Sequence, residues 1–143
     1  MRISTKGRYG LAAMLCVAGK KDDNQTVADV SKKLGVSKIY LEQVFGLLKT
    51  AGLLQSVKGA QGGYLLAAAA DRITVYDILK ATEAALFEPT EKSLSGEAEH
   101  LERIVQDFVW KPLGDQISGA LKEITLQSLL DAAQKPLGYM FFI

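Results

Sequence analysis

The sequence has very little cysteine and histidine. It contains one of each, Cys16 and His100, in 143 residues. A single cysteine excludes an internal disulfide and is typical of proteins that work in a reducing cytosol. One cysteine and one histidine cannot supply the four ligands of a structural zinc site. The motifs G-x-S-x-G, G-x-x-x-x-G-K-[ST] and G-x-G-x-x-G are also missing, so the sequence predicts no enzyme, metal site or cofactor.

Long apolar runs are missing as well. A membrane-spanning helix needs about 18 or more consecutive apolar residues, and no stretch of the chain approaches that length. The first ten residues, MRISTKGRYG, are polar and basic, which argues against a signal peptide. Hydrophobic residues nevertheless make up 48% of the chain, enough for a core. We therefore expect a cytoplasmic protein with one domain, or with one small domain and an accessory element.

Charge is distributed unevenly along the chain, although the net charge is only +1. Residues 1–82 contain twelve Lys or Arg against six Asp or Glu, whereas residues 83–143 contain five against ten. This asymmetry indicates that the first part meets a polyanion and the second does not. A chance division between two solvated surfaces is the alternative on charge alone.

The first fifty residues have the pattern of a helix-turn-helix. Ser4 is expected to cap a first helix, and Thr26, three residues before Asp29, forms a capping-box pattern for a second. Gly35 supplies a left-handed stop, and Ser37 is expected to cap a third helix. Two helices joined by a short glycine-containing turn are typical of a helix-turn-helix.

A β-hairpin is predicted directly after these helices. Two short apolar runs, LLQSV and YLLA, flank the loop KGAQGG. The predicted fold is therefore mainly α with a small β-hairpin wing, a winged helix-turn-helix. We expect the loop glycines to let the backbone approach a phosphate or a groove wall, with Lys58 supplying positive charge.

The third helix has two faces of different character at 100° per residue. Its inner face carries Leu41, Val44, Phe45 and Leu48, and its outer face carries Ile39, Gln43, Gly46 and Thr50, flanked by Tyr40 and Glu42. Ile39 suits a thymine methyl group, Gln43 an adenine edge and Glu42 the amino group of cytosine. An ordinary surface helix is the alternative interpretation.

The second half of the chain is predicted to carry a long apolar helix. Residues 85–95 lose periodicity around Pro89 and indicate a linker, after which Ser95 is expected to cap the helix and Pro112 to kink it. The expected dimerisation stripe consists of Leu101, Ile104, Val105, Phe108 and Val109. We expect residues 1–84 to form the DNA-binding domain, 85–95 a linker and 96–143 the dimerisation helices and tail, unless the stripe packs within one chain.

Three segments resemble a known protein family. MRISTKGRYGL, YLEQVFGLLKTAGL and KGAQGGYLL are similar to the bacterial winged-helix transcriptional regulators that include IscR, NsrR and CymR, and the likeness covers nearly the whole chain. The resemblance implies a homodimer that binds double-stranded DNA, most often as a repressor on a palindromic operator. The resemblance places Tyr40, Glu42 and Gln43 at base-reading positions, to which the outer face of the third helix adds Ile39. It places Thr5, Lys6 and Arg8 in a phosphate-contacting stretch and Lys58 at the wing, where the family commonly has arginine. We expect Lys38 and Gln61 to join these contacts to the DNA backbone and the wing.

The chain departs from the iron–sulfur members of that family. These bind a cluster through three cysteines after the segment ATE, where this chain reads AALFEPTEKSLSGEAEH. The resemblance therefore favours the cluster-free CymR type, which controls cysteine metabolism with O-acetylserine thiol-lyase as co-repressor. The tail, Tyr139, Met140, Phe141, Phe142 and Ile143, either docks into that enzyme or packs on the dimer.

Two other functions remain open at this stage. A winged helix retained as a protein-interaction module would bind DNA weakly and without sequence preference. A redox-responsive regulator would use Cys16, although a thiol on the apolar side of the first helix is more typical of a buried structural residue.

Overall fold

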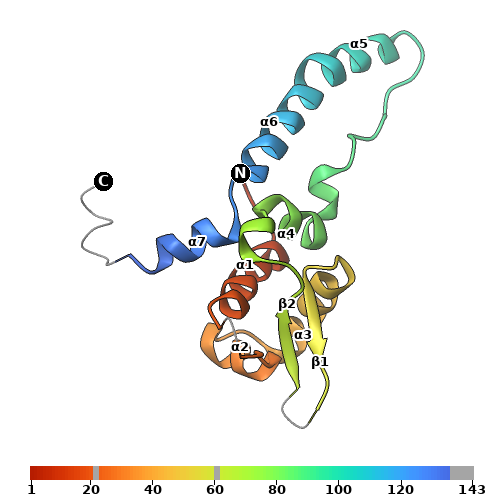
Figure 1. Ribbon diagram of the computed structural model, residues 1–143. Helices are drawn as coiled ribbons and strands as arrows, with labels where there is room; N and C mark the ends of the chain where they lie inside the picture. Colours follow the sequence, from red (N-terminus) through yellow and green to blue (C-terminus); the bar gives the residue numbers. More distant parts are fainter. Residues whose placement is uncertain (21–22, 60–61, 136–143) are drawn as a thin grey trace.

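The protein consists of a winged domain from which a helical rod projects (Figure 1). A computed structural model describes residues 1–20, 23–59 and 62–135. The β-hairpin lies at the end of the domain away from the rod. In chain order the elements are α1 (Thr5–Ala18), α2 (Val27–Leu34), α3 (Lys38–Thr50), β1 (Leu54–Val57), β2 (Gly63–Leu66), η1 (Ala70–Arg72), α4 (Val75–Thr82), η2 (Ala84–Phe87), α5 (Ala98–Val105), η3 (Gln106–Trp110), α6 (Lys111–Lys122) and α7 (Leu126–Ala133).

Short polar side chains begin the helices of the winged domain, as the sequence predicts. Ser4 accepts a hydrogen bond from the Gly7 amide, and Ser37 accepts one from the Tyr40 amide. Thr26 forms a complete capping box, and Gly35 ends α2 in the left-handed conformation with φ of 67°. These local bonds satisfy backbone groups that a helix end leaves without partners, so they fix where α1, α2 and α3 begin.

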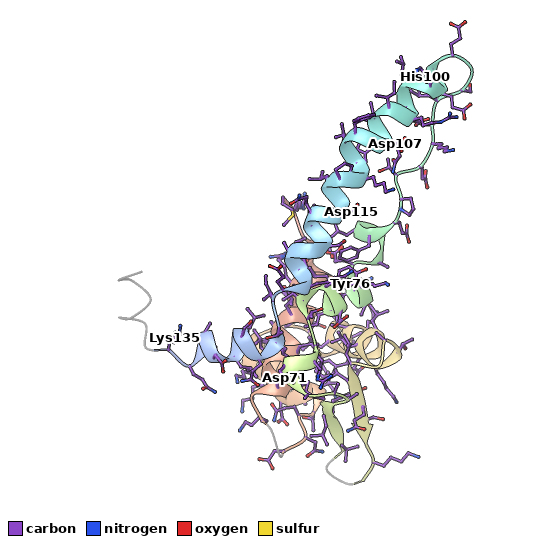
Figure 2. All side chains as sticks on the ribbon, turned by 45° about the horizontal axis from the view of Figure 1, so that its top comes forward. Asp71, Tyr76, His100, Asp107, Asp115 and Lys135 are labelled. Atoms are coloured by element: carbon purple, nitrogen blue, oxygen red, sulfur yellow. The ribbon has the colours of Figure 1, made fainter. Side chains whose placement is uncertain are left out.

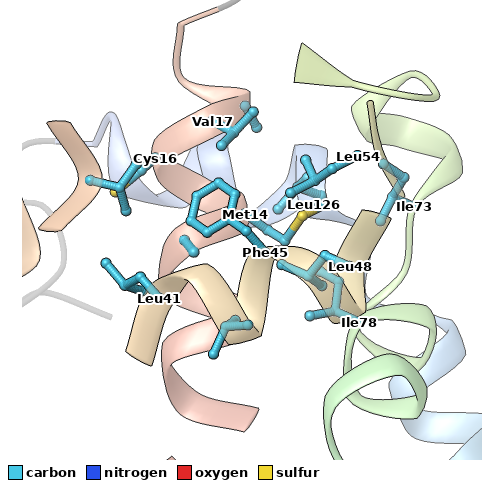
Figure 3. Packing of buried hydrophobic residues seen from close by; sticks show 14 of the residues in the cluster. Met14, Cys16, Val17, Leu41, Phe45, Leu48, Leu54, Ile73, Ile78 and Leu126 are labelled. Atoms are coloured by element: carbon cyan, nitrogen blue, oxygen red, sulfur yellow. The ribbon is translucent and has the colours of Figure 1, made fainter. Parts of the chain in front are cut away.

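The core lies between α1, α3 and α4 and is closed by the hairpin and α7 (Figure 3). The four residues assigned to the inner face of α3, Leu41, Val44, Phe45 and Leu48, are all fully buried. Met14 of α1 is fully buried beside them. Burial of one face of α3 in this core leaves its opposite face exposed to solvent.

The hairpin pairs antiparallel, with Leu54 opposite Leu66 and Val57 opposite Gly63. Gly63 in the hairpin also has a packing role that its sequence context did not indicate. A Cβ on Gly63 would lie 2.6 Å from the carbonyl oxygen of Gln25, because Gln25 forms a β-bridge with Tyr64. Gly63 therefore lets the strand approach the segment before α2, and only Gly59, with φ of 133°, requires glycine for its conformation.

Substitution of Gly63 by alanine should lower the stability of the fold. The atoms in its way are backbone atoms and cannot rotate aside, so we expect a loss of about 1–3 kcal/mol, or several degrees in melting temperature. Gly46→Ala is the matched control, since a Cβ there meets nothing within 4 Å. Because alanine favours the helix more than glycine does, this variant should be more stable to unfolding by about 1 kcal/mol. Both are measured by thermal unfolding at one protein concentration, and a stable Gly63→Ala protein would contradict this explanation.

The rod is a continuous helical segment made of α5, η3 and α6 (Figure 1). The prediction that Ser95 caps it is wrong, because α5 begins after Glu97 without a side-chain cap. Pro112 lies in the first turn of α6, and the five residues before α6, Gln106–Trp110, form a π-helical turn. That wider turn admits the proline ring, which would otherwise clash with the preceding turn, so the helix continues.

The segment before α5 is held to the rod by one carboxylate. Glu102 accepts hydrogen bonds from the backbone amides of Ser93 and Leu94 and from the Ser93 hydroxyl. The bonds from the two amides lower the pKa of Glu102, so the carboxylate is ionised at neutral pH. The loop therefore covers one side of the rod. Figure 2 shows His100, Asp107 and Asp115 spaced along it and Tyr76 near its foot.

After the rod, α7 returns to the winged domain. Leu126 is fully buried and Leu130 is nearly so, both in the same core as α1 and α3. The amide of Leu126 donates to the Ile73 carbonyl, and the amide of Val75 donates to the Ile124 carbonyl. Helix α7 thus completes the core of the winged domain, whereas α5, η3 and α6 form the projecting rod. Across the described ranges, no helix has the length and hydropathy to cross a membrane.

Candidate nucleic-acid interface

The outer face of α3 is exposed and carries few charges. Ile39 is 72% exposed, although it is a large apolar residue. Glu42 and Gln43 are exposed beside it. Gly46 is also exposed, with open space where a side chain would be. An exposed isoleucine on the same face as a bare backbone position favours close approach by a partner rather than simple solvation.

Tyr40 differs from the other residues assigned to base reading. It is half-buried and its ring packs edge-on against Tyr9 of α1, with 5.6 Å between ring centroids. This contact fixes the first turn of α3 against the second turn of α1. Sequence analysis did not single out Tyr9; its place one turn after Thr5 in an amphipathic helix was the available signal.

The first turns of α1 carry the residues assigned to the DNA backbone. Lys6 and Arg8 are exposed and Thr5 is partly exposed. The Arg8 guanidinium donates to the Thr5 hydroxyl at 3.3 Å. Because Tyr9 packs on Tyr40, these cationic side chains lie at the same end of the domain as the start of α3.

The wing adjoins the start of α3 on its other side. Lys38 and Glu42 line a shallow groove of about 340 Å³ together with Val57 and Gly63 of the hairpin. Lys58 follows β1 and is exposed. Gln61, also assigned to the wing, lies outside the described residues. The structure thus brings α1 and the hairpin each against the start of α3. The described residues that were assigned to DNA contact on these elements, apart from Tyr40, are called the reading surface below: Thr5, Lys6, Arg8, Lys38, Ile39, Glu42, Gln43 and Lys58.

The rod exposes an apolar face that no described residue of the chain covers. All five residues assigned to dimerisation are exposed, and Leu101 and Phe108 reach 61% and 78%. Gln106 instead lines the space between the rod and the loop at residues 89–92. One side of the rod is therefore covered by its own chain, and the other is bare and hydrophobic.

Cys16 is buried in α1, with 5% of its surface exposed. Burial raises the pKa of its thiol above the ordinary value, and Lys33 opposes this only in part. The thiolate, which is the reactive form, is therefore disfavoured at neutral pH. Within the described ranges, no three His, Cys, Asp or Glu side chains gather where they could hold a metal ion.

The chain is similar to known transcriptional regulators over most of its length. It is 36% identical over 132 residues to the HTH-type transcriptional regulator IscR of Cronobacter sakazakii, covering 92% of this chain and 81% of that protein. The IscR of Erwinia tasmaniensis is 38% identical over the same length, with 79% of that protein covered.

Two solved structures share the fold closely. CymR of B. subtilis, described as its global cysteine regulator, has a TM-score of 0.75 at 32% identity and covers 92% of this chain and 98% of CymR. IscR of T. potens has a TM-score of 0.74 at 34% identity and covers 99% and 96%. The model of the Rrf2 family, described as iron-dependent transcriptional regulators, matches residues 3–132. The chain belongs to the Rrf2 family of DNA-binding winged-helix transcriptional regulators.

Proposed function

We propose that the protein is a homodimeric repressor that reads a palindromic operator with the reading surface. The observation that carries the proposal is the continuity of three elements: α1 packs on the start of α3 through Tyr9 and Tyr40, and the hairpin lines a groove with Lys38 and Glu42 of α3. Cationic side chains stand on the two outer elements, and the side chains suited to base edges stand between them. This arrangement suits a helix placed in the major groove with phosphates on both sides.

Affinity and sequence preference come from different parts of the reading surface in this proposal. Lys6, Arg8 and Lys58 neutralise phosphates and release counterions, which supplies affinity for any duplex. Glu42 and Gln43 contact base edges and supply the discrimination. Tyr40 acts mainly by holding α3 against α1, because its ring is engaged with Tyr9.

The second copy of the chain is proposed to cover the apolar face of the rod. Exposure to water of an apolar stripe that contains Leu101 and Phe108 is unfavourable in free energy. In a two-fold dimer, the stripes of the two chains bury each other. Pairing through the rods leaves the hairpins free, because the hairpin lies at the end of the domain away from the rod (Figure 1). Two reading surfaces related by a two-fold axis match a palindromic site.

Selection of duplexes from a random pool tests this function. We expect the protein to enrich a two-fold symmetric sequence whose half-sites are spaced by about one turn of DNA or a multiple of it. Specific affinity should exceed the affinity for unrelated duplexes by at least about a thousandfold at one fixed salt concentration. Enrichment of no sequence would favour the alternative, a winged helix that serves as a protein-interaction module.

The iron chemistry in the family description does not fit the residues of this chain. An iron–sulfur cluster needs several thiolates, and the chain has one buried thiol and no gathering of metal ligands within its described part. We therefore infer regulation without a cluster. The raised pKa of the Cys16 thiol also argues against the redox-responsive alternative, because oxidants act on exposed thiolates.

Control of cysteine or sulfur metabolism is the regulatory role that we propose. The cluster-free composition and the likeness to CymR favour it, and CymR is described as a global cysteine regulator. O-acetylserine thiol-lyase is the proposed co-repressor, with the aromatic tail segment entering the enzyme. The tail residues Tyr139, Met140, Phe141, Phe142 and Ile143 lie outside the described residues, so the proposal rests on their sequence.

Deletion of residues 139–143 should abolish capture of the thiol-lyase if the tail docks. Tagged full-length protein and the deletion variant are used to capture purified enzyme, with and without O-acetylserine. We expect the full-length protein alone to retain it, and O-acetylserine to release it by competition for the active site. Equal capture by both proteins would exclude tail docking, and absence of capture by the full-length protein would exclude this partner.

A further inference from the structure

The cap at the start of α1 is completed by a residue from a distant part of the chain. In α2 and α4, the capping Thr bonds the amide three residues on, and an Asp at that position bonds back to the Thr amide. In α1, Ser4 accepts from the Gly7 amide at 3.4 Å, but Gly7 has no side chain to return the bond. The carboxylate of Glu83 takes that place, accepting from the Ser4 amide at 2.5 Å.

Two glycines make room for this contact. A Cβ on Gly7 would lie 2.7 Å from Cγ of Glu83, and a Cβ on Gly10 would lie 2.9 Å from Cγ2 of Thr82. Thr82 is buried, and its hydroxyl donates to the Ile78 carbonyl at 3.0 Å. Two successive residues at the end of α4 thus seat against two glycines one turn apart in α1. The fit is specific, because both positions exclude any larger residue unless a side chain moves.

Glu83 also stands at the point where the chain leaves the winged domain for the rod. It directly precedes η2, whose Phe87 packs against Tyr76 with 4.9 Å between ring centroids. The Nζ atom of Lys122 in α6 lies over the same Tyr76 ring, 4.5 Å from its centre. The foot of the rod, η2 and the carboxylate of Glu83 therefore form one chain of contacts that ends at the first turn of α1.

We propose that Glu83 is a positioning residue through which the rod and its linker set the first turn of α1 for DNA binding. The proposal rests on the proposed function, because Thr5, Lys6 and Arg8 of that turn are its phosphate contacts. A state of the rod that shifts η2 would withdraw Glu83 and leave the turn without half of its cap. If the first turn of α1 frays, the apparent affinity for DNA falls, because only molecules in which this turn is ordered make the phosphate contacts.

Electrostatics alone predicts the opposite effect of Glu83. A carboxylate near phosphate-binding residues repels DNA, so its removal should tighten binding to every duplex. Glu83→Gln removes the charge but keeps an oxygen that can accept the Ser4 bond, whereas Glu83→Ala removes both. The two variants therefore separate the positioning role from simple repulsion.

Operator affinity of the full-length variants is the first measurement. We expect Glu83→Ala to bind the operator roughly three- to tenfold more weakly than Glu83→Gln at the same salt concentration. Equal affinities of the two variants would overturn the proposal. If the wild-type protein itself shows no operator preference, the proposed function fails instead, and the two failures are thereby distinguished.

Hydrogen exchange without DNA supplies the second measurement. Glu83→Ala should speed exchange of the amides at residues 4–8 by roughly tenfold, while amides of α3 remain protected. Phe87→Ala, which loosens η2, should have the same effect in smaller degree, and the double variant should exchange no faster than Glu83→Ala alone. Additive effects, or unchanged exchange in Phe87→Ala, would overturn the coupling, and melting temperatures verify that each variant is folded.

Discussion

Replacement of Phe108 by glutamate should leave the protein monomeric at concentrations where the wild type is a dimer. In the single chain Phe108 is 78% exposed, so the change does not disturb the core of the winged domain. In a two-fold interface the substitution occurs twice. Each copy loses about 2 kcal/mol of apolar burial, so the dissociation constant of the dimer should rise by at least about a thousandfold.

The Phe108→Glu variant should also bind the operator more weakly, because it no longer dimerises. A monomer binds one half-site without the advantage of a second reading surface held nearby, which is worth about 10²–10⁴ in affinity. Analytical ultracentrifugation gives the oligomeric state, and operator titration gives the affinity.

Gln106→Glu is the matched control for this substitution. It adds the same charge to the same helical rod, on the side that the loop at residues 89–92 covers. We expect that variant to remain dimeric and to bind the operator as the wild type does. A dimeric Phe108→Glu protein with normal operator affinity would show that the bare face of the rod has another partner.

Substitution of Glu42 or Gln43 by alanine should relax the choice of sequence by about 1–3 kcal/mol for each hydrogen bond to a base edge that the substitution removes. Both side chains are exposed on the outer face of α3 and neither supports the core. Glu42→Ala also removes a negative charge from the reading surface and should tighten binding to unrelated duplexes. The ratio of operator to non-operator affinity is therefore the quantity to measure, because the operator affinity alone mixes the two effects.

Lys58→Ala and Lys6→Ala are the contrasting variants. Each should weaken binding to all duplexes alike and reduce the slope of log affinity against log salt by about one unit. Lys111→Ala, an exposed cation on the rod, should change neither quantity. If the α3 variants bound every sequence more weakly by the same factor, Glu42 and Gln43 would not be base-reading residues.

The local elements of the winged domain were predictable from the sequence because their signals are local. A capping residue and its partner lie three positions apart, and the inner face of α3 repeats at helical spacing. The hairpin was equally predictable from two apolar runs around a glycine-rich loop. Such interactions form between neighbours in the chain, so their pattern is visible in the order of residues.

The prediction of where the rod begins was wrong because the deciding interaction is not local. Ser95 has the right residue type for a cap, but Glu102 holds the backbone of Ser93 and Leu94 and so fixes the segment before α5. The helix therefore begins after Glu97. A competing bond from a residue further along the chain cannot be read from local capping preference.

The sequence by itself determined the fold class and the family, because helical period, caps and motifs encode them directly. The DNA-contacting roles of the reading surface stay predictions from the same patterns. Only the tertiary structure explains the glycines at positions 7, 10 and 63. Each of these glycines leaves space that atoms of a segment distant in the sequence occupy. The tertiary structure also decided that α7 completes the winged domain and that Glu83 caps α1. These features depend on which distant segments meet, and that is set by packing of the whole core rather than by any short pattern.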